Sequence, residues 1–250
     1  MQNKFYFNSE FSDIFEKPKK NSPISTQILF GESFKIIKKH KKFYKIKIIH
    51  DNYIGYIRKK KFYSNYKPSH KVHILKSKIY KLKKSGSFYK TNNYLPFLSK
   101  VEIIKKYKSH AMFKKNYWIN INDLKPLKHK IRNFINILGL FNNIKYKWGG
   151  RTFAGIDCSA LTQLFYIYNN KFFPRDTVDQ IKVKKGVKYK KNFKKGDIIF
   201  WKGHVGICLN SKKFLHAYGP KKKVVVMPID KTIDLINKTA KLKVKKIFSI

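Results

Sequence analysis

Acidic residues and cysteines are scarce in this chain of 250 residues. Only 13 aspartates and glutamates accompany 58 lysines and arginines, so the formal net charge is +45. Two cysteines, Cys158 and Cys208, are too few for a disulfide framework at this length, and we expect both to be reduced thiols. No Cys and His spacing fits a zinc site, and no glycine-rich loop fits a phosphate cradle. We therefore predict neither a metal nor a cofactor.

Arginine is rare as well, with Arg58, Arg132, Arg151 and Arg175 standing among the many lysines. A field this positive would attract nucleic acid, anionic lipid or an acidic wall polymer. Base contacts and phosphate clamps depend mainly on arginine, however, and the lysines are spread through every segment. Together with an excess of Ile, Asn, Phe and Tyr, this spread favours codon drift over a specific nucleic-acid site.

Long apolar runs are also missing. The run near the middle of the chain, Ile135–Phe141, is far too short to span a bilayer, and the amino terminus lacks the apolar core of a signal peptide. We expect no membrane span and a cytoplasmic location, with export by another route left open. Wholesale disorder is excluded, because 42% of the residues are hydrophobic and 16% are aromatic. The sequence does not indicate an oligomeric state.

The amino-terminal half is predicted to form small β modules. Residues 1–23 are polar and contain two prolines, which is typical of a mobile arm. Short apolar or alternating runs then predict one module at residues 24–66 and a second at residues 70–126. Two pairs of similar segments suggest tandem copies of one module, although two β-rich segments could match this well by chance. The pairs are Phe34–Lys39 with Val101–Lys106, and Asn52–Ile57 with Asn116–Ile121.

Residues 129–250 mix helices with strands. Apolar residues at helical spacing predict one helix between Ile131 and Leu138 and another that follows Asp157. Four apolar runs further on predict strands joined by hairpins. These features indicate an α+β domain in which helices pack on an antiparallel sheet. The predicted strands are Asp197–Trp201, Val205–Leu209, Phe214–Ala217 and Val224–Met227.

Cys158 is the leading candidate for a catalytic residue. Asp157 is expected to cap the helix, which places Cys158 in the first turn, where unpaired amides and the helix dipole favour an anion. A thiol ionises most easily at such a position. His204 and His216 follow downstream, so the pattern predicts a cysteine peptidase.

The two histidines flank one predicted turn. Asn210 is their midpoint, so an odd-numbered loop centred there would place His204 and His216 directly opposite each other on one face of the sheet. A two-residue loop would put them on opposite faces. With Cys158 against that face, His204 could take the thiol proton and His216 could hold the other ring nitrogen.

A simpler interpretation stays open, in which Cys158 is a buried core cysteine and both histidines are ordinary strand residues. The Gly-Gly turn before Cys158 and the shared hairpin of the histidines weaken it. Cys208, in the middle of a predicted strand, is expected to be structural.

Six short blocks occur in order within about residues 129–230. They are Tyr146–Gly150, Asp157–Leu161, Phe173–Thr177 with Gln180, Gly196–Phe200, His204–Ile207 and His216–Ala217. Together they closely resemble the NlpC family of papain-like peptidases, which cut bacterial cell-wall peptides. The β region resembles, more loosely, the paired bacterial SH3-like modules that precede this domain in some members. That looser match is carried by Leu29–Glu32 and Asp51–Tyr56.

The resemblance implies a catalytic role for four residues. Cys158 would be the nucleophile, His204 the general base and His216 the polar third member that orients the base. Tyr146 would help to stabilise the oxyanion, beside the backbone amide of Cys158. Members with SH3-like modules cut the bond between γ-D-glutamate and a diamino acid, in freed wall peptides whose amino terminus is unblocked.

The resemblance also implies a substrate pocket. Asp157, Ser159, Asp176 and Thr177 match positions that line it, and Trp148 would form a wall. An acidic residue of the first SH3-like module helps to bind the substrate ammonium, which needs a carboxylate partner once it leaves water. The candidates in that module are Glu32, with Tyr53 or Tyr56 nearby. Each of these acids could instead be a cap, a turn former or an exposed charge.

The sequence therefore favours a cysteine peptidase that trims peptidoglycan-derived peptides as a recycling enzyme. The alternative is a catalytically inert protein that binds the wall or another polyanion through its SH3-like modules and its charge. Nucleic-acid binding through charge alone is a third hypothesis.

Overall fold

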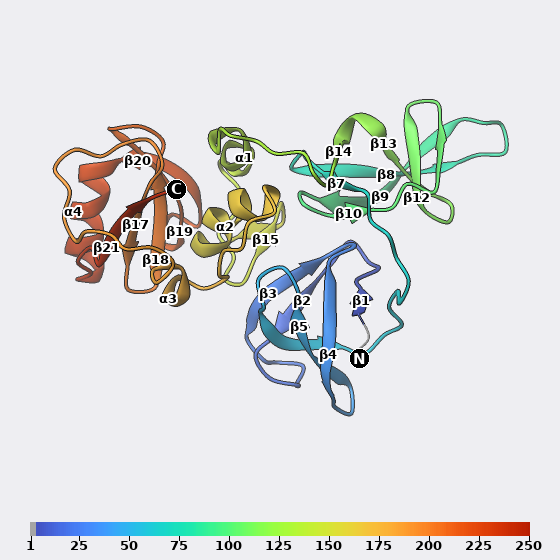
Figure 1. The fold of residues 1–250 in the computed structure, drawn as a ribbon, viewed down its shortest axis with the longest axis horizontal. Coiled ribbons are helices and arrows are strands. Elements are labelled where there is room, and N and C mark those ends of the chain that lie inside the picture. The colour runs from blue at the N-terminus through green and yellow to red at the C-terminus, as the bar shows by residue number, and fades with distance from the viewer. Residues whose placement is uncertain (1–3) are drawn as a thin grey trace. The chain divides into compact units, whose positions relative to one another are not determined.

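The structure is a computed structural model that describes residues 4–250. The chain divides into two compact units, of which one ends at His129 and the other begins at Lys130 (Figure 1). Each unit has its own sheets and its own buried apolar clusters. Across the residues that the structure describes, no helix has the length and apolar character needed to cross a membrane.

A six-stranded antiparallel sheet forms the first part of the amino-terminal unit. Its strand order is β1-β4-β5-β6-β2-β3. Side chains alternate between the two faces of a strand, so Ile46 and Ile48 of β5 are buried together with Phe34 of β4 and Ile57 of β6. The strands are β1 (Lys4–Tyr6), β2 (Phe11–Phe15), β3 (Ile24–Leu29), β4 (Ser33–Lys39), β5 (Phe43–Ile48) and β6 (Ile54–Arg58).

The predicted mobile arm at residues 1–23 is wrong where the structure describes it. Strand β1 pairs with β4, and β2 pairs with β3 and β6. Phe7 and Ile14 are fully buried in the core of this sheet. Burial of two large apolar side chains stabilises the fold by roughly 3–6 kcal/mol, which outweighs the polar character of the residues between them. Residues 1–3 lie outside the described residues.

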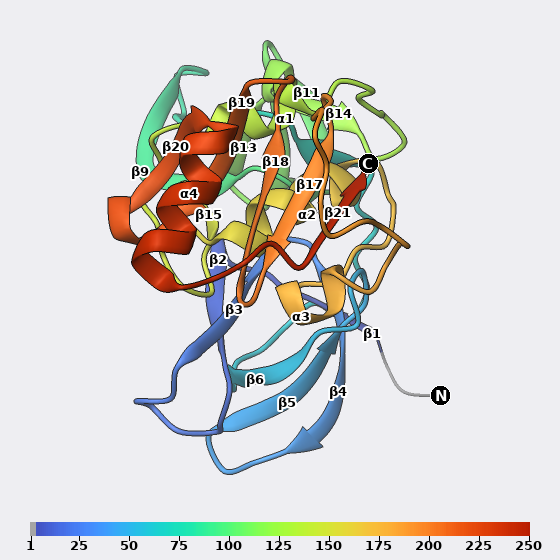
Figure 2. The ribbon, with the colours of Figure 1, turned by 90° about the vertical axis from the view of Figure 1, so that its left-hand side faces the viewer.

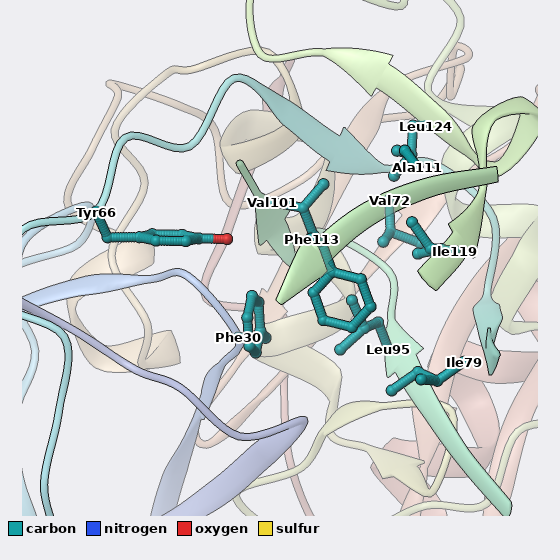
Figure 3. Packing of buried hydrophobic residues seen from close by; sticks show 10 residues of the cluster. All are labelled: Phe30, Tyr66, Val72, Ile79, Leu95, Val101, Ala111, Phe113, Ile119 and Leu124. Atoms are coloured by element: carbon teal, nitrogen blue, oxygen red, sulfur yellow. The ribbon is translucent and has the colours of Figure 1, made fainter. Parts of the chain in front are cut away.

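Two further sheets complete the amino-terminal unit, with strand orders β10-β7-β14 and β11-β12-β13-β8-β9. Their core also includes Phe30, whose ring meets Phe113 edge-on at 5.2 Å (Figure 3). Gly31 permits this approach, because a Cβ there would lie 1.9 Å from the Lys100 carbonyl oxygen. The strands are β7 (His70–Val72), β8 (Lys76–Leu82), β9 (Phe88–Pro96), β10 (Lys100–Val101), β11 (Lys105–Tyr107), β12 (His110–Lys114), β13 (Tyr117–Asn120) and β14 (Leu124–Pro126).

The carboxyl-terminal unit is a five-stranded antiparallel sheet with a helix on each face (Figure 2). Its strand order is β20-β19-β18-β17-β21. Helix α2 (Cys158–Tyr168) packs on β18 and β19, and α4 (Ile229–Ala240) packs on β19 and β20 from the other side. The remaining elements are α1 (Ile135–Leu138), β15 (Arg151–Thr152), β16 (Gly155–Ile156), α3 (Thr177–Gln180), β17 (Asp197–Trp201), β18 (His204–Cys208), β19 (Lys213–Tyr218), β20 (Lys223–Pro228) and β21 (Lys246–Ser249).

The four predicted strands of this unit are confirmed to within one residue at each end. The first predicted helix is wrong at its start, because α1 begins only at Ile135. The Asn169 side chain accepts from the Ile131 N–H at 2.9 Å and donates to the Ile131 carbonyl at 3.1 Å, which holds Ile131 outside the helix. These bonds come from a residue far along the chain, so helical spacing alone does not reveal them.

Candidate active site

Cys158 is buried as the first residue of α2. Asp157 caps this helix, because its Oδ1 accepts from the Ala160 N–H at 2.8 Å, and the predicted helix start is confirmed. The turn before the helix is tight. Gly149 has a φ of 71°, and a Cβ at Gly150 would lie 2.4 Å from a backbone carbonyl oxygen. Glycine at both positions lets the chain fold back against the start of α2.

A buried ion pair holds Asp157 behind the thiol. Arg175 donates to both carboxylate oxygens, at 3.0 Å to Oδ1 and 2.6 Å to Oδ2, and it also donates to Ser159 Oγ at 2.8 Å. The Gly149 N–H donates to Oδ2 at 2.9 Å. Arg175 is 2% exposed, so this planar, two-pronged contact lies away from water. The pair fixes the capping residue and, through it, the position of Cys158.

The sequence alone gives Arg175 no role, although its block matches the family. The available signal is its rarity in a chain where lysine is the default cation. Two of the four arginines, Arg151 and Arg175, are almost fully buried, whereas Arg58 and Arg132 are exposed. Where lysine replaces arginine almost everywhere, a retained arginine marks a site that needs the guanidinium shape.

Strands β18 and β19 form a hairpin with a three-residue loop. Cys208 lies opposite Phe214, and residues 210–212 form the loop. The predicted odd loop is confirmed, but its predicted centre is wrong, because the turn is centred on residue 211. Asn210 begins the turn, since its Oδ1 accepts from the backbone N–H groups two and three residues further on.

This register makes His204 and His216 diagonal neighbours on one face, instead of direct partners. His204 Nε2 lies 2.9 Å from His216 Nδ1, so the two rings share a hydrogen bond. Gly206 provides the space, because a Cβ there would lie 2.7 Å from the His216 Cβ. The Tyr218 ring stacks on His216 with centroids 4.8 Å apart. Both imidazoles are therefore fixed in position.

Burial keeps the two histidines neutral at ordinary pH. It lowers the pKa of His204 to about 4. Burial also lowers the pKa of His216 to about 3, and the nearby His204 and Lys221 add to this effect. Each ring then carries one proton, so one nitrogen of each ring is a donor and the other an acceptor. A neutral His204 can accept a proton.

The Cys158 thiol lies beside the beginning of β18. Burial, followed by the charge of Asp157, raises the pKa of the thiol to about 12, while the Val205 N–H opposes the rise. Because Val205 follows His204, this contact places the sulfur next to the strand that carries His204. The expectation of an easily ionised thiol is wrong for the resting protein, since desolvation outweighs the helix dipole. The thiol needs a base to ionise.

Tyr146 is close to the thiol. Burial, followed by the nearby Cys158, raises the pKa of its hydroxyl above the ordinary value, so the hydroxyl keeps its proton and can donate it. The Tyr146 N–H donates to the Lys222 carbonyl at 2.8 Å, which anchors this stretch to the segment before β20. Trp148, two residues later, is 63% exposed. Its indole is open to a ligand.

The other predicted substrate residues of this unit fall into two groups. Asp157 and Ser159 are buried, and both bond to Arg175, so their side chains have internal partners. Asp176 and Thr177 are partly exposed at the start of α3. The geometry thus gives the first two a positioning function and leaves the second two accessible.

Three predicted substrate residues belong to the amino-terminal unit. Glu32 is fully buried, and its carboxylate accepts from the Leu29 N–H at 2.8 Å and lies 3.6 Å from a ring nitrogen of His50. Tyr53 packs against the core of the first sheet. The Tyr56 ring meets a histidine edge-on and lies under a lysine ammonium. Each residue therefore has contacts within its own unit.

Comparison with known proteins identifies two regions of the chain. Residues 143–238 match the NlpC/P60 family, and residues 14–62 match the bacterial dipeptidyl-peptidase Sh3 domain. The chain carries an NlpC/P60 domain. This domain contains Cys158, both histidines of the dyad and Tyr146, and an SH3-like domain precedes it. The chain is accordingly a peptidase of the cysteine class.

Proteins similar to this chain align with different shares of its length. The γ-D-glutamyl-L-lysine dipeptidyl-peptidase of Bacillus subtilis is 26% identical over 236 residues, which are 84% of this chain and 77% of that protein. Dipeptidyl-peptidase 6 of Lysinibacillus sphaericus is 33% identical over 34% of this chain and 31% of its own length. The crystal structure of an NlpC/P60 family protein from Bacillus cereus has a TM-score of 0.74 at 17% identity. It covers 91% of this chain and 94% of that one, and it shows a shared fold.

Proposed function

We propose that this chain hydrolyses the bond between γ-D-glutamate and a diamino acid in peptides derived from the bacterial cell wall. The observation that carries the proposal is the hydrogen-bonded pair of His204 and His216, 2.9 Å apart, on the strands beside a buried thiol at a helix start. Two relatives named γ-D-glutamyl-L-lysine dipeptidyl-peptidase, from Bacillus subtilis and Bacillus cereus, support the substrate class.

The first half of the reaction forms a thioester. His204 takes the Cys158 proton as the sulfur attacks the carbonyl carbon of the γ-glutamyl bond, so no free thiolate is needed beforehand. The Cys158 backbone N–H and the Tyr146 hydroxyl donate to the oxyanion that forms. The carbon–nitrogen bond then breaks, and His204 returns its proton to the leaving amine.

The second half of the reaction releases the acid. His204 takes a proton from water as the oxygen attacks the thioester. The carbon–sulfur bond then breaks, and His204 returns this proton to the sulfur, which restores the Cys158 thiol and the neutral imidazole. His216 holds the far nitrogen of His204 throughout both halves. The Arg175–Asp157 pair keeps the start of α2 in place, so the nucleophile does not move between steps.

Substrate recognition is proposed to depend on a free amino terminus. A substrate ammonium that approaches a chain of net charge +45 needs a local carboxylate. Asp176 is partly exposed in the NlpC/P60 domain and is one candidate. Glu32, Tyr53 and Tyr56 are the sequence-based candidates in the SH3-like domain. In the NlpC/P60 domain, Trp148 supplies an apolar wall.

The mechanism is tested with L-Ala-γ-D-Glu-L-Lys and free lysine as the readout. Cys158→Ala is expected to lower turnover by a factor of roughly a thousand or more, since it removes the nucleophile. Cys208→Ala is the matched control, because Cys208 is also buried but belongs to the apolar cluster under α4. Undiminished turnover by Cys158→Ala would overturn the proposal.

Recognition of the amino terminus is tested by comparing the free peptide with its N-acetyl form. Acetylation removes the ammonium, so kcat/KM is expected to fall by roughly a hundredfold, as for loss of a buried charged contact. Equal cleavage of the two peptides would exclude the carboxylate role of Asp176 and Glu32 without touching the catalytic roles.

Residues 70–126 are proposed to be a second SH3-like module, produced by duplication. Strands β4, β5 and β6 pair as an antiparallel meander, and so do β11, β12 and β13. Three of the four similar segments fall on β4, β6 and β13, and the fourth, Val101–Lys106, runs from the end of β10 into the first two residues of β11. An experimental structure in which these two regions have unrelated strand connections would reject the duplication.

A polyanion-binding function is the second candidate, favoured by one hollow on the first sheet. Its volume is about 760 Å³, and its lining contains no carboxylate. Lys41→Glu with Lys42→Glu should weaken binding of inorganic polyphosphate much more than Lys83→Glu with Lys84→Glu, which changes the net charge equally. Equal effects of the two double variants would mean that polyphosphate responds to the overall positive charge of the protein and not to this hollow. The lining is Pro18, Lys19, Lys20, His40, Lys41, Lys42, Phe43, Arg58 and Lys59.

A further inference from the structure

The hydrogen-bond chain at the active site continues past the second histidine to a methionine. His216 Nδ1 faces His204, and His216 Nε2 lies 3.5 Å from the Met227 Sδ. Met227 lies on β20 two residues from Val225, the direct partner of His216, so the strand pairing places the sulfur diagonally beside the ring. The chain therefore runs His204, His216, Met227.

A thioether sulfur has lone pairs but no hydrogen to donate. In its contact with Met227, His216 Nε2 must therefore carry the ring proton. His216 is fully buried and neutral, so its Nδ1 is then bare and can only accept. The hydrogen bond between the rings thus has one direction, in which His204 Nε2 is the donor.

The position of the proton on His216 also determines its position on His204. A neutral His204 with its proton on Nε2 has a bare Nδ1, and in the proposed mechanism this is the nitrogen that takes the thiol proton. If His216 carried its proton on Nδ1 instead, His204 would carry its own on Nδ1 and could not take the proton of Cys158. Only one of the two proton arrangements of this pair is catalytically competent.

We propose that Met227 is a positioning residue that selects the competent tautomer of His204 through His216. This inference rests on the proposed function of the dyad and extends it by one residue. The Met227 sulfur contacts the His216 ring, so its effect travels through the orientation of the shared protons. The Tyr218 ring holds the face of His216 while the Met227 sulfur holds its edge.

The tautomers are read directly by ¹⁵N NMR of the resting protein labelled at histidine. Bare and protonated ring nitrogens differ strongly in ¹⁵N shift, so each histidine reports which nitrogen carries the proton. We expect His204 and His216 both to carry it on Nε2 at neutral pH. A proton on Nδ1 of His216 in the wild-type protein would overturn the inference. This readout needs no substrate, so it stands apart from any failure of the proposed reaction.

Two variants extend the test to turnover. Met227→Leu keeps the apolar volume but removes the acceptor, so a second tautomer should appear and kcat should fall roughly three- to tenfold with KM unchanged. Met227→Glu supplies an acceptor-only group and should restore the single tautomer and kcat. Met112→Leu, on β12, is the matched control and should change neither. Unchanged tautomers and kcat in Met227→Leu would contradict the role of the sulfur.

The glutamate variant carries a further signature. Its carboxylate is expected to face His216, whose other titratable neighbours are His204 and Lys221, and an added negative charge favours the protonated imidazole. The acid limb of kcat/KM should therefore move to higher pH in Met227→Glu and stay in place in Met227→Leu. A methionine with a purely structural role would move neither limb.

Discussion

Individual residues in this active site owe their protonation states to burial. Cys158 keeps its proton because burial raises its pKa to about 12, and His204 stays neutral because burial lowers its pKa to about 4. Neither state favours a preformed thiolate–imidazolium pair. In the proposed mechanism, proton transfer therefore accompanies the attack, which is general-base catalysis.

The acid limb of activity follows from His204. The base is competent above its folded pKa, so the acid limb of kcat/KM is expected near pH 4, well below the ordinary histidine value of about 6.5. Initial rates measured from about pH 3.5 to about pH 7.5 locate this limb, because the range covers both the lowered and the ordinary histidine pKa. A limb near the ordinary histidine value would mean that His204 is solvated in the resting protein.

The same two histidines make stability depend on pH. As pH falls below about 6.5, both histidines become protonated in the unfolded chain. In the folded chain they become protonated only near pH 4 for His204 and near pH 3 for His216, so protonation favours the unfolded state between these values. The free energy of unfolding should fall by about 1.4 kcal/mol per pH unit for each histidine across that window. Urea unfolding of the His216→Gln variant should show a shallower fall, and an identical slope would contradict the assignment.

Arg175 is the residue whose shape should matter most. Arg175→Lys keeps the charge but cannot hold both oxygens of Asp157 and Ser159 at once, so it should lower stability by about 1–3 kcal/mol. Arg175→Met should cost more, about 3–5 kcal/mol, because it leaves a buried carboxylate unpaired. Thermal unfolding measures both, with the exposed Arg132→Lys as the control. If Arg175→Lys were as stable as Arg132→Lys, the two-pronged contact of Arg175 with Asp157 would not contribute to stability.

Sequence reasoning at this scale predicted Cys158, His204 and His216 as the candidate site, because each lies in a short motif with a recognisable chemical pattern. It did not find the functions of Arg175 or Met227. Their partners, Asp157 and His216, are brought to them by the helix start and by the register of β19 with β20. A contact that depends on strand register has no local signature in the chain.

At the scale of elements, the hairpin of β18 and β19 sets the geometry of the two histidines. Its odd loop was predictable from the positions of the histidines, since an even loop separates them. Its centre was not, because the Asn210 side chain starts the turn through bonds that spacing does not encode. The diagonal placement of the rings follows from that one-residue shift.

Gly206 is the position in the hairpin that leaves room for the dyad. Gly206→Ala would place a Cβ 2.4 Å from the Phe214 ring and 2.7 Å from the His216 Cβ, so the His216 ring must move away from His204. We expect at least a tenfold fall in kcat and a loss of about 1–3 kcal/mol in stability. Gly139→Ala is the control, because nothing lies within 4 Å of a Cβ there. Full activity of Gly206→Ala would show that the ring contact is dispensable.

The whole molecule carries a large excess of positive charge over its 13 acids. Repulsion among like charges destabilises the compact state, and salt screens it. The midpoint of thermal unfolding should therefore rise by several degrees between about 0.01 M and about 0.5 M sodium chloride, where the Debye length falls from about 30 Å to a few ångströms. A midpoint that does not change with salt would indicate that the lysines are spaced too widely to interact.

At this scale the sequence predicted the order of β modules and α+β domain, because hydrophobic period and turn residues mark each element. The mobile arm was mispredicted, because residues 4–15 include Phe5, Phe7, Ile14 and Phe15, which pack in or against the core of the first sheet. Their burial depends on the strands that receive them, and those strands come later in the chain.

Mass spectrometry of the acyl-enzyme tests the central claim most directly. The protein is mixed with L-Ala-γ-D-Glu-L-Lys, quenched in acid and digested, and each cysteine-containing peptide is weighed. The account predicts an added L-Ala-γ-D-Glu acyl group on the peptide that contains Cys158, none on the peptide that contains Cys208, and no adduct in Cys158→Ala. An adduct on any other residue, or lysine release by Cys158→Ala, would contradict it.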